Sequence, residues 1–504
     1  MNLPVLFLML MLVAPALLLA ADPMSVGLTR TRAVIEATSV SATIPDAPIV
    51  LIVAGLEGQA GALVSNEVNR YAARKKRPWR LLAIPQANPN HAQLIFPPSG
   101  QAYRDNPESH YLWRWIGMQA PDLVLVADHA DTGLADALSR NIVAGVGRIP
   151  ARRVEPGGAL LSSLPPHIPK SEAHLGLERR LARTPHQIAE QLAEYYGHDF
   201  NEPVYIPAMA LIARLRLGSL EDFQRLAAPY ADGSKDALAH ATSSNLGGHL
   251  LFAELAERTG DARYIGLVRK AADLGFTDDG SKKDTGVMKD AMPLHNEMSD
   301  AVFMACPLLA KAGKLTHDRK YFELALRHLE FMQKLCLRPD GLYRHSPLDQ
   351  AAWGRGNAFP ALGLALTLSD LPDTDPVFLT MLASYRNHMK ALAPFQDENG
   401  MWREVVDVPG SYSEFSATAM IALAMVRGIR SGWLDRTQYQ PRVDKAWRAL
   451  RLRISADGRL VDVCESTGKQ PSLEAYLNRA AILDRDPRGG GMALLLATEL
   501  ELLP

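Results

Sequence analysis

The hydrophobic pattern divides the chain near residue 185. Upstream, between residues 48 and 138, short apolar runs alternate with segments of helical periodicity. The runs predict buried strands at residues 49–53, 81–84 and 123–126. Strands that alternate with helices are typical of a small α/β unit.

From residue 185 onward, apolar residues recur with the 3.6-residue period of helices. The expected helices span residues 186–196, 204–217, 249–258, 264–274, 301–312, 320–335, 360–368, 377–392, 416–431 and 441–454. Several end in a Gly turn and a short apolar or aromatic segment, at residues 340–343, 398–402 and 457–460. About a dozen helices in such repeated pairs predict a toroid of inner and outer helices, with the short segments at one rim around a substrate cleft. A helical solenoid without an active site is the alternative.

The first residues have the pattern of an export signal. An apolar run at residues 4–20 ends in small residues, so we expect residues 1–21 to be a secretory signal peptide and the protein to be periplasmic or extracellular. No Lys or Arg precedes the run, which is close to the length of a membrane span, so a retained anchor is the alternative. We expect an α/β domain at residues 22–184, with a Pro- and Gly-rich linker or irregular segment at 156–169, and a helical domain at 185–504.

Composition argues against some classes of function. Apolar residues make up 47% of the chain and charged residues 22%, as in an ordinary soluble globular protein. The formal net charge of −1 argues against a nucleic-acid binder held by a general basic field. Cys306, Cys336 and Cys464 are too few for a disulfide framework and show no CxxC spacing, so we expect buried free thiols.

Two segments of the helical domain combine side chains that suit a sugar site. Asp300 opens an apolar stretch, and later in the chain Trp353, Arg355 and Asn357 alternate with Gly354 and Gly356. An aromatic face can stack on a sugar ring, an arginine can pair with a carboxylate, and an aspartate can transfer a proton. Each segment also has a purely structural interpretation, a helix N-terminus at Asp300 and a turn at residues 353–357.

The order of these motifs resembles that of the unsaturated uronyl hydrolases of glycoside hydrolase families 88 and 105. The resemblance runs from about residue 190 to the C-terminus and rests on residues 300–310, 341–345, 353–359, 401–407, 414–420 and 462–468. It implies a mainly α fold, an (α/α)6 barrel, here preceded by the smaller α/β domain. It also implies an enzyme that removes a 4,5-unsaturated uronic acid from the non-reducing end of lyase-generated oligosaccharides, without a metal or an organic cofactor.

The implied substrate is a vinyl ether. Protonation of its C4=C5 double bond gives an oxocarbenium-like cation, water adds at C5, and the resulting hemiketal opens and expels the rest of the sugar. One carboxyl group can donate the proton and then orient or deprotonate the water, whereas an ordinary glycosidase uses two carboxyl groups.

The resemblance assigns roles to individual residues. Asp300 would be the proton donor, and its apolar neighbours should raise its pKa. Arg355 would bind the uronate carboxylate, Trp353 would stack on the sugar, and His345 would bond to a hydroxyl group. The other substrate-binding positions that it implies are Asn357, Phe359 and Trp402, and of the remaining candidates Trp402 and Glu414 are the weaker ones.

Two positions depart from the family pattern. Where the family has a second aspartate, in a Thr-His-Asp-Leu-Gly-like segment, this chain has Asn245. An amide can bond to a hydroxyl group or to water, but it cannot act as a base, so Asn245 at this catalytic position puts the standard activity or substrate in question. The last aromatic residue of the family's WxRGNxW motif is Phe359, which keeps a stacking face and lacks the indole N–H.

Residues 48–135 resemble a zinc carboxypeptidase domain that has lost its metal ligands. The matching segments are residues 49–61, 83–89 and 121–129. Glu57 and Ala60 occupy the two ligand positions of the family's HxxE pair, and only His129 remains as a plausible ligand. We therefore expect no working zinc site, and a docking, glycan-binding or barrel-capping role.

Four functions remain open. The first is the unsaturated uronyl hydrolase, whose partner would be a uronic-acid-containing oligosaccharide, with the uronate, the following sugar and the oligomeric state left open. A glycosidase on saturated uronides would need a second carboxylate, for which Glu297, Asp290 and Glu414 are candidates. A glycan-binding protein without turnover, and an amidase or peptidase run by the N-terminal domain, are the other two.

Overall fold

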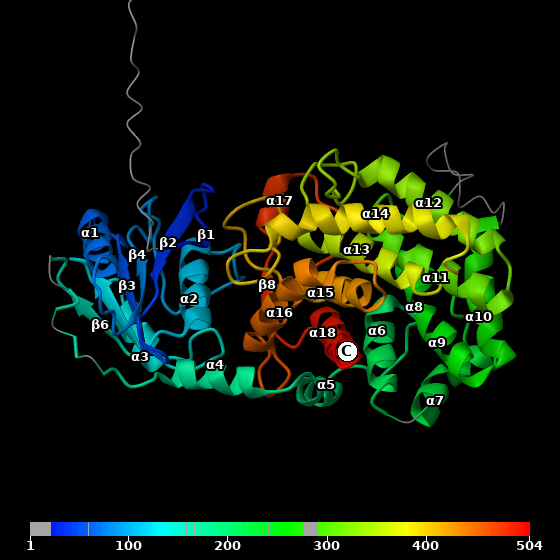
Figure 1. Ribbon diagram of the computed structural model, residues 1–504, viewed down its shortest axis with the longest axis horizontal. Helices are drawn as coiled ribbons and strands as arrows, with labels where there is room; N and C mark the ends of the chain where they lie inside the picture. Colours follow the sequence, from blue (N-terminus) through cyan, green and yellow to red (C-terminus); the bar gives the residue numbers. More distant parts are fainter. Residues whose placement is uncertain are drawn as a thin grey trace, which may run out of the picture.

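The computed structural model describes residues 22–503 except residues 59, 158–159, 163, 166, 219, 240 and 277–290. The expected signal peptide, residues 1–21, and the candidate carboxylate Asp290 lie outside the described residues. An α/β part and a larger helical part lie side by side along the longest axis (Figure 1). Across the described residues, no helix is long and apolar enough to cross a membrane.

A six-stranded sheet in the order β1-β2-β4-β3-β5-β6 forms the centre of the α/β part. Its strands are β1 (Asp22–Leu28), β2 (Val34–Val40), β3 (Ile49–Ala54), β4 (Arg80–Ile84), β5 (Leu123–Ala127) and β6 (Ala151–Val154). The strands expected at residues 49–53, 81–84 and 123–126 are β3, β4 and β5, and β3 pairs in parallel with both of the others.

Helices cover both faces of this sheet. They are α1 (Gly61–Ala72), α2 (Pro107–Gln119) and α3 (Leu134–Arg140). Successive strand residues point to opposite faces, so Leu51 and Val53 pack with α2 and α3, whereas Val50 and Ile52 pack with α1.

The helical part is an (α/α)6 barrel, as expected. Its inner helices contact one another in a closed ring that runs from α6 to α18 and back to α6. The inner helices are α6 (Tyr205–Leu215), α8 (Ser243–Gly248), α9 (Leu250–Thr259), α11 (Ala301–Thr316), α13 (Gly354–Leu368), α15 (Phe415–Arg430) and α18 (Pro487–Leu500). The outer helices are α5 (Pro185–Ala193), α7 (Leu220–Ala231), α10 (Ala262–Asp273), α12 (Lys320–Cys336), α14 (Pro376–Leu392) and α16 (Arg436–Leu452). Helices α10 and α14 continue into the short 3-10 helices Leu274–Phe276 and Ala393–Phe395.

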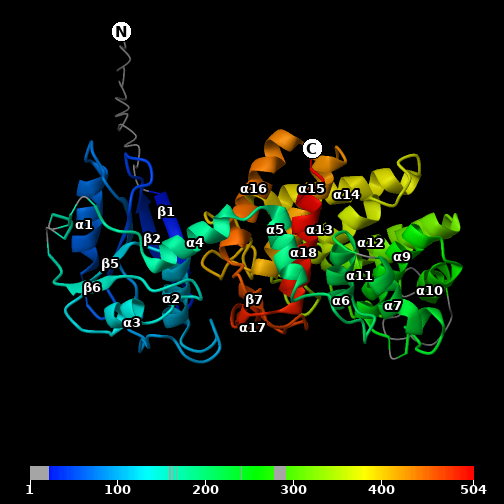
Figure 2. The same cartoon turned by 90° about the horizontal axis from the view of Figure 1, so that it is seen from below.

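Small elements lie between the barrel and the α/β part. They are the antiparallel strands β7 (Leu460–Cys464) and β8 (Ala481–Asp484) and the short helix α17 (Leu473–Leu477). Both views place them on the side of the barrel that faces the α/β part (Figures 1 and 2). Helix α4 (Glu172–Ala182) follows the sheet in the chain and packs against α16.

Candidate active site

The candidate site lies where the inner helices begin. An outer helix runs back between consecutive inner helices, so the inner helices are parallel and their N-termini meet at one rim. Asp300 precedes α11, Trp353 precedes α13, Glu414 precedes α15, and Tyr205 is the first residue of α6. Helix N-termini carry partial positive charge, so this rim favours an anionic group of a ligand.

Asp300 lies next to His345 in a nearly closed environment. Its Oδ1 atom is 3.2 Å from Nε2 of His345, and the two side chains are 5% and 0% exposed. The angle between them is not that of a hydrogen bond, and within the described part of the chain neither atom has another partner. Both are therefore buried polar atoms that a ligand can still satisfy.

The other side of His345 is held by Tyr476. The Nδ1 atom of His345 is 2.8 Å from the Tyr476 hydroxyl, which also accepts a hydrogen bond from the backbone N–H of Gln470 at 3.0 Å. The imidazole ring also packs 4.4 Å from the indole of Trp353. These contacts fix the orientation of the imidazole ring that faces Asp300. A group that takes part in proton transfer needs such a fixed orientation.

Arg355 is a buried cation whose hydrogen-bond donors are largely in use. Its Nη1 atom donates to Ser416 Oγ and to the carbonyl of Cys464, both at 3.2 Å, and Nη2 donates to the carbonyl of Ser466. Burial opposes its charge, but Cys464 and Glu414 outweigh burial and raise its pKa. Its Nε atom finds no acceptor among the residues that the structure describes. The expected carboxylate clamp is thus an anchored guanidinium with one free N–H edge.

Trp353 is enclosed rather than open to a sugar face. It is fully buried, and its Nε1 atom donates to Oε1 of Glu404 at 2.8 Å. The guanidinium carbons of Arg355 and Arg479 lie over its ring at 5.1 and 4.5 Å from the centroid. In this structure its ring contacts the cations at the site, so the expected stacking of Trp353 on a sugar stays a prediction.

Three other expected ligand contacts lie behind the site. The Asn357 carboxamide binds the backbone N–H and carbonyl of Tyr343 and the carbonyl of Trp353. Phe359 is fully buried against Tyr205 and Phe303. Trp402 is also fully buried, and its indole donates to the carbonyl of Leu392 at 2.8 Å. The structure gives all three a packing role, because the polar groups of Asn357 and Trp402 already bind the protein.

Asn245 is the third residue of α8, at the same rim. Its Oδ1 atom accepts hydrogen bonds from the backbone N–H and the hydroxyl of Thr242, at 2.8 and 3.0 Å, and closes a capping box. Its Nδ2 atom makes only a long bond of 3.5 Å to the carbonyl of Pro203. The oxygen of this amide is therefore occupied, and its N–H donors are the part that can reach a ligand.

The candidates for a second carboxylate differ from Asp300. The Glu414 carboxylate caps α15, where it accepts the N–H groups of Ser416 and Ala417, the Ser416 hydroxyl and the N–H of Cys464. Glu297 is partly exposed, and its Oε2 atom lies 3.7 Å from Nζ of Lys469. Neither presents a buried, unoccupied carboxyl group.

Sequence reasoning missed four groups at the site, namely Tyr205, Glu404, Tyr476 and Arg479. Glu404 lies within residues 401–407, one of the motifs on which the family resemblance rests. Its carboxylate next to apolar residues was the signal that could have identified it. The hydroxyl of Tyr205 is buried and, among the described residues, has no hydrogen-bond partner. Burial raises its pKa to about 12, and the charges of Arg355 and Asp300 act on it in opposite directions. Tyr476 and Arg479 gave no sequence signal, since they reach the site only through the tertiary fold.

Asp128 and His129, at the position of the expected third zinc ligand, have other partners in the structure. His129 is exposed, and its Nδ1 atom lies 3.2 Å from Glu155. Asp128 instead stabilises the loop after β3, where its Oδ2 atom accepts the N–H groups of Leu56 and Glu57. In the described ranges, no three His, Cys, Asp or Glu side chains are grouped as metal ligands would be.

Known proteins resemble the helical part. An unsaturated rhamnogalacturonyl hydrolase of Bacillus subtilis is 32% identical over 186 residues, which are 35% of this chain and 52% of that protein. An unsaturated 3S-rhamnoglycuronyl hydrolase of Formosa agariphila is 32% identical over 183 residues, 32% of this chain and 48% of that protein. The chain thus spans about half the length of the curated relatives that it matches.

Solved structures share the fold at low identity. A family 88 glycosyl hydrolase from Bacteroides vulgatus has a TM-score of 0.53 and 18% identity, over 64% of this chain and 100% of that chain. A family 105 glycoside hydrolase from C. acetobutylicum has a TM-score of 0.54 and 19% identity, over 62% of this chain and 99% of that chain. The family model of Glycosyl Hydrolase Family 88 matches residues 209–503, which is more than half of the chain. The chain therefore belongs to Glycosyl Hydrolase Family 88.

Proposed function

We propose that the protein is an unsaturated uronyl hydrolase, which removes a 4,5-unsaturated uronic acid from the non-reducing end of lyase-generated oligosaccharides. The observation that carries the proposal is the buried pair of Asp300 and His345 at a rim that also holds the Arg355 cation. A proton donor near a carboxylate-binding charge is what a vinyl-ether uronate requires. The names of the Bacillus and Formosa relatives support the same substrate class.

In the proposed reaction, the carboxylic acid of Asp300 donates its proton to C4 of the double bond and leaves an oxocarbenium-like cation at C5. Water adds to C5 and gives a proton to the Asp300 carboxylate, which restores the acid. The hemiketal at C5 opens to a ketone, and the hemiacetal left at C1 expels the rest of the oligosaccharide as an alcohol. His345 lies 3.2 Å from the Asp300 carboxyl group, with its Nε2 atom open to a substrate hydroxyl group, and the free edge of Arg355 binds the uronate.

One carboxyl group carries both proton transfers in this proposal. The oxygen of Asn245 is committed to Thr242, and an amide accepts no proton at neutral pH. The Glu414 carboxylate is occupied by the first turn of α15 and by the N–H of Cys464. These two groups are occupied, so a glycosidase on saturated uronides would have to use the buried Glu404, whose Oε2 atom has no partner among the described residues, as its second carboxyl group.

The test is the loss of ultraviolet absorbance when purified protein meets lyase-generated oligosaccharides from pectin, ulvan, heparin-like and glucuronan polymers. We expect loss with at least one of them and a fall of about 100-fold to 10,000-fold in kcat in Asp300→Asn. Asp318→Asn is the matched control, because Asp318 is partly exposed and lies beyond the other end of α11. Absorbance that stays constant with every substrate contradicts the proposal, and binding without turnover would then identify a glycan-binding protein.

We further propose that residues 1–21 direct export and that the α/β part is a carboxypeptidase-like domain without zinc. The apolar run before the first strand and the loop position taken by Glu57 support these two points. Mass analysis of the mature N-terminus from the periplasmic fraction tests the first. Zinc analysis of the purified protein tests the second, and one bound zinc per chain would contradict it.

A further inference from the structure

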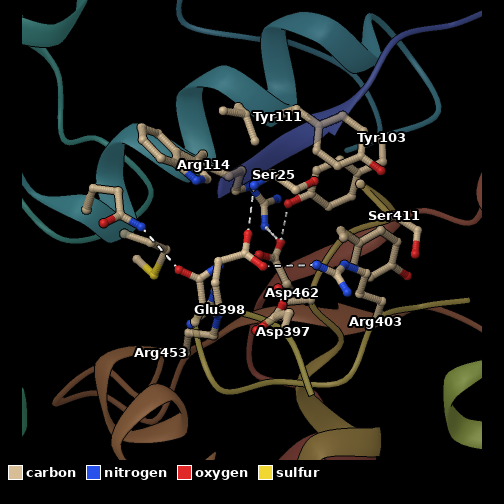
Figure 3. Close-up of a pocket in the computed structure, with 18 residues that line it drawn as sticks. Ser25, Tyr103, Tyr111, Arg114, Asp397, Glu398, Arg403, Ser411, Arg453 and Asp462 are labelled. Carbon is tan, nitrogen blue, oxygen red and sulfur yellow. Dashed lines mark hydrogen bonds and ion pairs between the residues drawn. The ribbon is translucent and has the colours of Figure 1, made fainter. Parts of the chain in front are cut away.

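A buried aspartate on β7 faces the α/β part. Asp462 has a φ of +68° at a break in register between Val461 and Val463. Its Oδ1 atom accepts hydrogen bonds from Nη1 of Arg114 at 2.5 Å and from the hydroxyl of Tyr103 at 2.9 Å (Figure 3). Arg114 lies on α2, and its side chain and that of Asp462 are 9% and 5% exposed.

These contacts offset two unfavourable features of β7 at Asp462. A positive φ is unfavourable for a residue with a side chain, and a buried carboxylate is unfavourable without a partner. The bonds from Arg114 and Tyr103 offset both costs, so the shape of β7 at this point depends on the α/β part.

Two residues further along, β7 contacts the candidate site. The N–H of Cys464 donates to Oε1 of Glu414 at 2.9 Å, and its carbonyl accepts from Nη1 of Arg355 at 3.2 Å. Its thiol lies 3.3 Å from Oε1 of Glu404, the acceptor of the Trp353 indole. A displacement of Cys464 would therefore disturb the anchoring of Arg355 and Trp353 together.

A second contact from the α/β part reaches the same residues. The ring of Tyr103 stacks on that of Tyr412, with centroids 4.5 Å apart and planes 9° from parallel. The carbonyl of Tyr412 accepts the N–H of Glu404 at 2.8 Å, and the carbonyl of Glu404 accepts the N–H of Gly354 at 2.7 Å. One hydrophobic cluster accordingly joins both parts of the molecule, and its members include Leu28, Tyr103, Tyr111, Trp353, Tyr412, Cys464 and Tyr476.

The contact around Asp462 is too close to admit a sugar. The pocket drawn in Figure 3 has a volume of about 40 Å³, and a bound water needs roughly 10–15 Å³ measured in this way. Gly410, at a φ of +86°, brings the barrel so near that a Cβ there would lie 2.9 Å from Leu28 Cδ2. This pocket suits a few water molecules, so the contact around Asp462 is a support, whereas wider spaces of about 270 and 400 Å³ open elsewhere at the same interface, near Arg104 and near Lys445.

We propose that the α/β part is a structural component of the active site, and that Arg114 is a positioning residue that acts through Asp462 and Cys464 on Arg355 and Trp353. This inference rests on the proposed function only for its kinetic consequence. The structural consequence, protection of Cys464 by a residue of the other part of the chain, is measurable without any substrate.

The structural test is the rate of thiol labelling, read for each cysteine by peptide mass spectrometry in the full-length protein. Cys306, Cys336 and Cys464 are all buried and free. In Arg114→Met we expect Cys464 to react at least about tenfold faster through local opening of β7, with the other two rates unchanged. Arg148→Met is the control, because Arg148 is exposed and pairs with Glu172 on α4.

Two milder variants keep the test decisive if Arg114→Met does not fold. Tyr103→Phe removes one bond to Asp462 and keeps the stacked ring, and Arg114→Lys keeps the charge. Each should raise the Cys464 rate alone, by less than Arg114→Met. Equal acceleration of all three cysteines, no acceleration, or the same effect from Arg148→Met would overturn the proposal.

The kinetic test separates positioning from general stability. Displacement of Arg355 should weaken substrate binding, so in Arg114→Met we expect KM to rise about tenfold while kcat changes less than about threefold, with partial rescue in Arg114→Lys. A lowered thermal midpoint with unchanged KM would overturn the proposal. If the native protein turns over no oligosaccharide, the proposed function fails, and the labelling experiment still decides this inference.

Discussion

The indole Nε1 atom of Trp353 donates a 2.8 Å hydrogen bond to Oε1 of Glu404, and both side chains are fully buried. Burial raises the pKa of Glu404 to about 8, with Glu414 adding to the rise and Arg479 and Arg355 opposing it. The second oxygen, Oε2, has no partner in the part of the chain that the structure describes. The Glu404 carboxyl group, which accepts the Trp353 hydrogen bond, is therefore mainly protonated and neutral at pH 7.

Glu404 should make the stability of the protein depend on pH. Its folded-state pKa of about 8 lies above the ordinary 4.5, so the folded protein retains a proton that the unfolded chain releases. The stabilisation is complete below the unfolded pKa and is lost as the pH rises through the folded pKa. In Glu404→Gln the amide mimics the neutral acid. From about pH 5 to about pH 8, the free energy of unfolding of this variant should therefore fall less than that of the native protein, with a difference on the order of a few kcal/mol. Urea unfolding at several pH values measures the difference, and identical pH dependence of the two proteins would refute the assignment.

Tyr476→Phe should lower activity with little structural change. The substitution removes the hydroxyl that bonds to Nδ1 of His345 and keeps the ring that packs near Trp353. Loss of one buried hydrogen bond costs about 1–3 kcal/mol, and we expect kcat/KM to fall about tenfold because His345 loses its fixed orientation. Tyr321→Phe is the control, since its hydroxyl bonds to Asp273 on the outer ring. An equal loss of activity in the two variants would assign Tyr476 to stability alone.

Asn245→Asp tests whether the amide limits turnover. A carboxylate oxygen can accept the same bonds from Thr242, so the capping box and the thermal midpoint should be preserved. A second acid at this rim should raise kcat about tenfold or more, because it can stabilise the cation and take the proton of the water. The absorbance assay measures the change. Lower activity in Asn245→Asp would show instead that the N–H donors of the amide are what the site uses.

Two glycines in helices should respond in opposite ways to alanine. A Cβ at Gly490 in α18 would lie 2.3 Å from the ring of Tyr196, whereas one at Gly266 in α10 would meet no described heavy atom within 4 Å. Gly490→Ala should destabilise the protein by about 1–3 kcal/mol through overpacking. Gly266→Ala should stabilise it by about 0.5–1 kcal/mol through helix propensity. Thermal unfolding compares the two, and a stable Gly490→Ala protein would mean that α18 can shift away from Tyr196.

The long apolar helices were predictable because their pattern is local. Helices α11 and α15 are buried along most of their length, and their sequences show it directly. Helix α18 was not predicted, since it begins Pro-Arg-Gly-Gly-Gly, a sequence typical of a turn. Its glycines leave room for residues that are distant in the chain and pack against the helix, such as Tyr196. Strands β1 and β2 were also missed, because they lie upstream of the segment with clear apolar runs.

For the site, motif spacing indicated which residues would meet and said little about what they would contact. The structure brings Asp300 to His345, and His345 to Trp353. Arg355 donates to the carbonyls of Cys464 and Ser466, which lie more than a hundred residues away in the sequence. No local pattern reports such a contact. For the same reason, the inward positions of Asn357 and Trp402 were not foreseen.

Closure of the inner ring by α18 has a consequence for biosynthesis. Nη1 of Arg216, just after α6, donates to Thr498 Oγ1 across 282 positions of the chain. While the chain is being made, α6 and α15 lack their shared neighbour and each leaves an apolar flank uncovered. Such long-range pairing is slow and leaves intermediates prone to aggregate. The ring closes only when α18 is available, so we expect products that lack α18 to be insoluble rather than partly active.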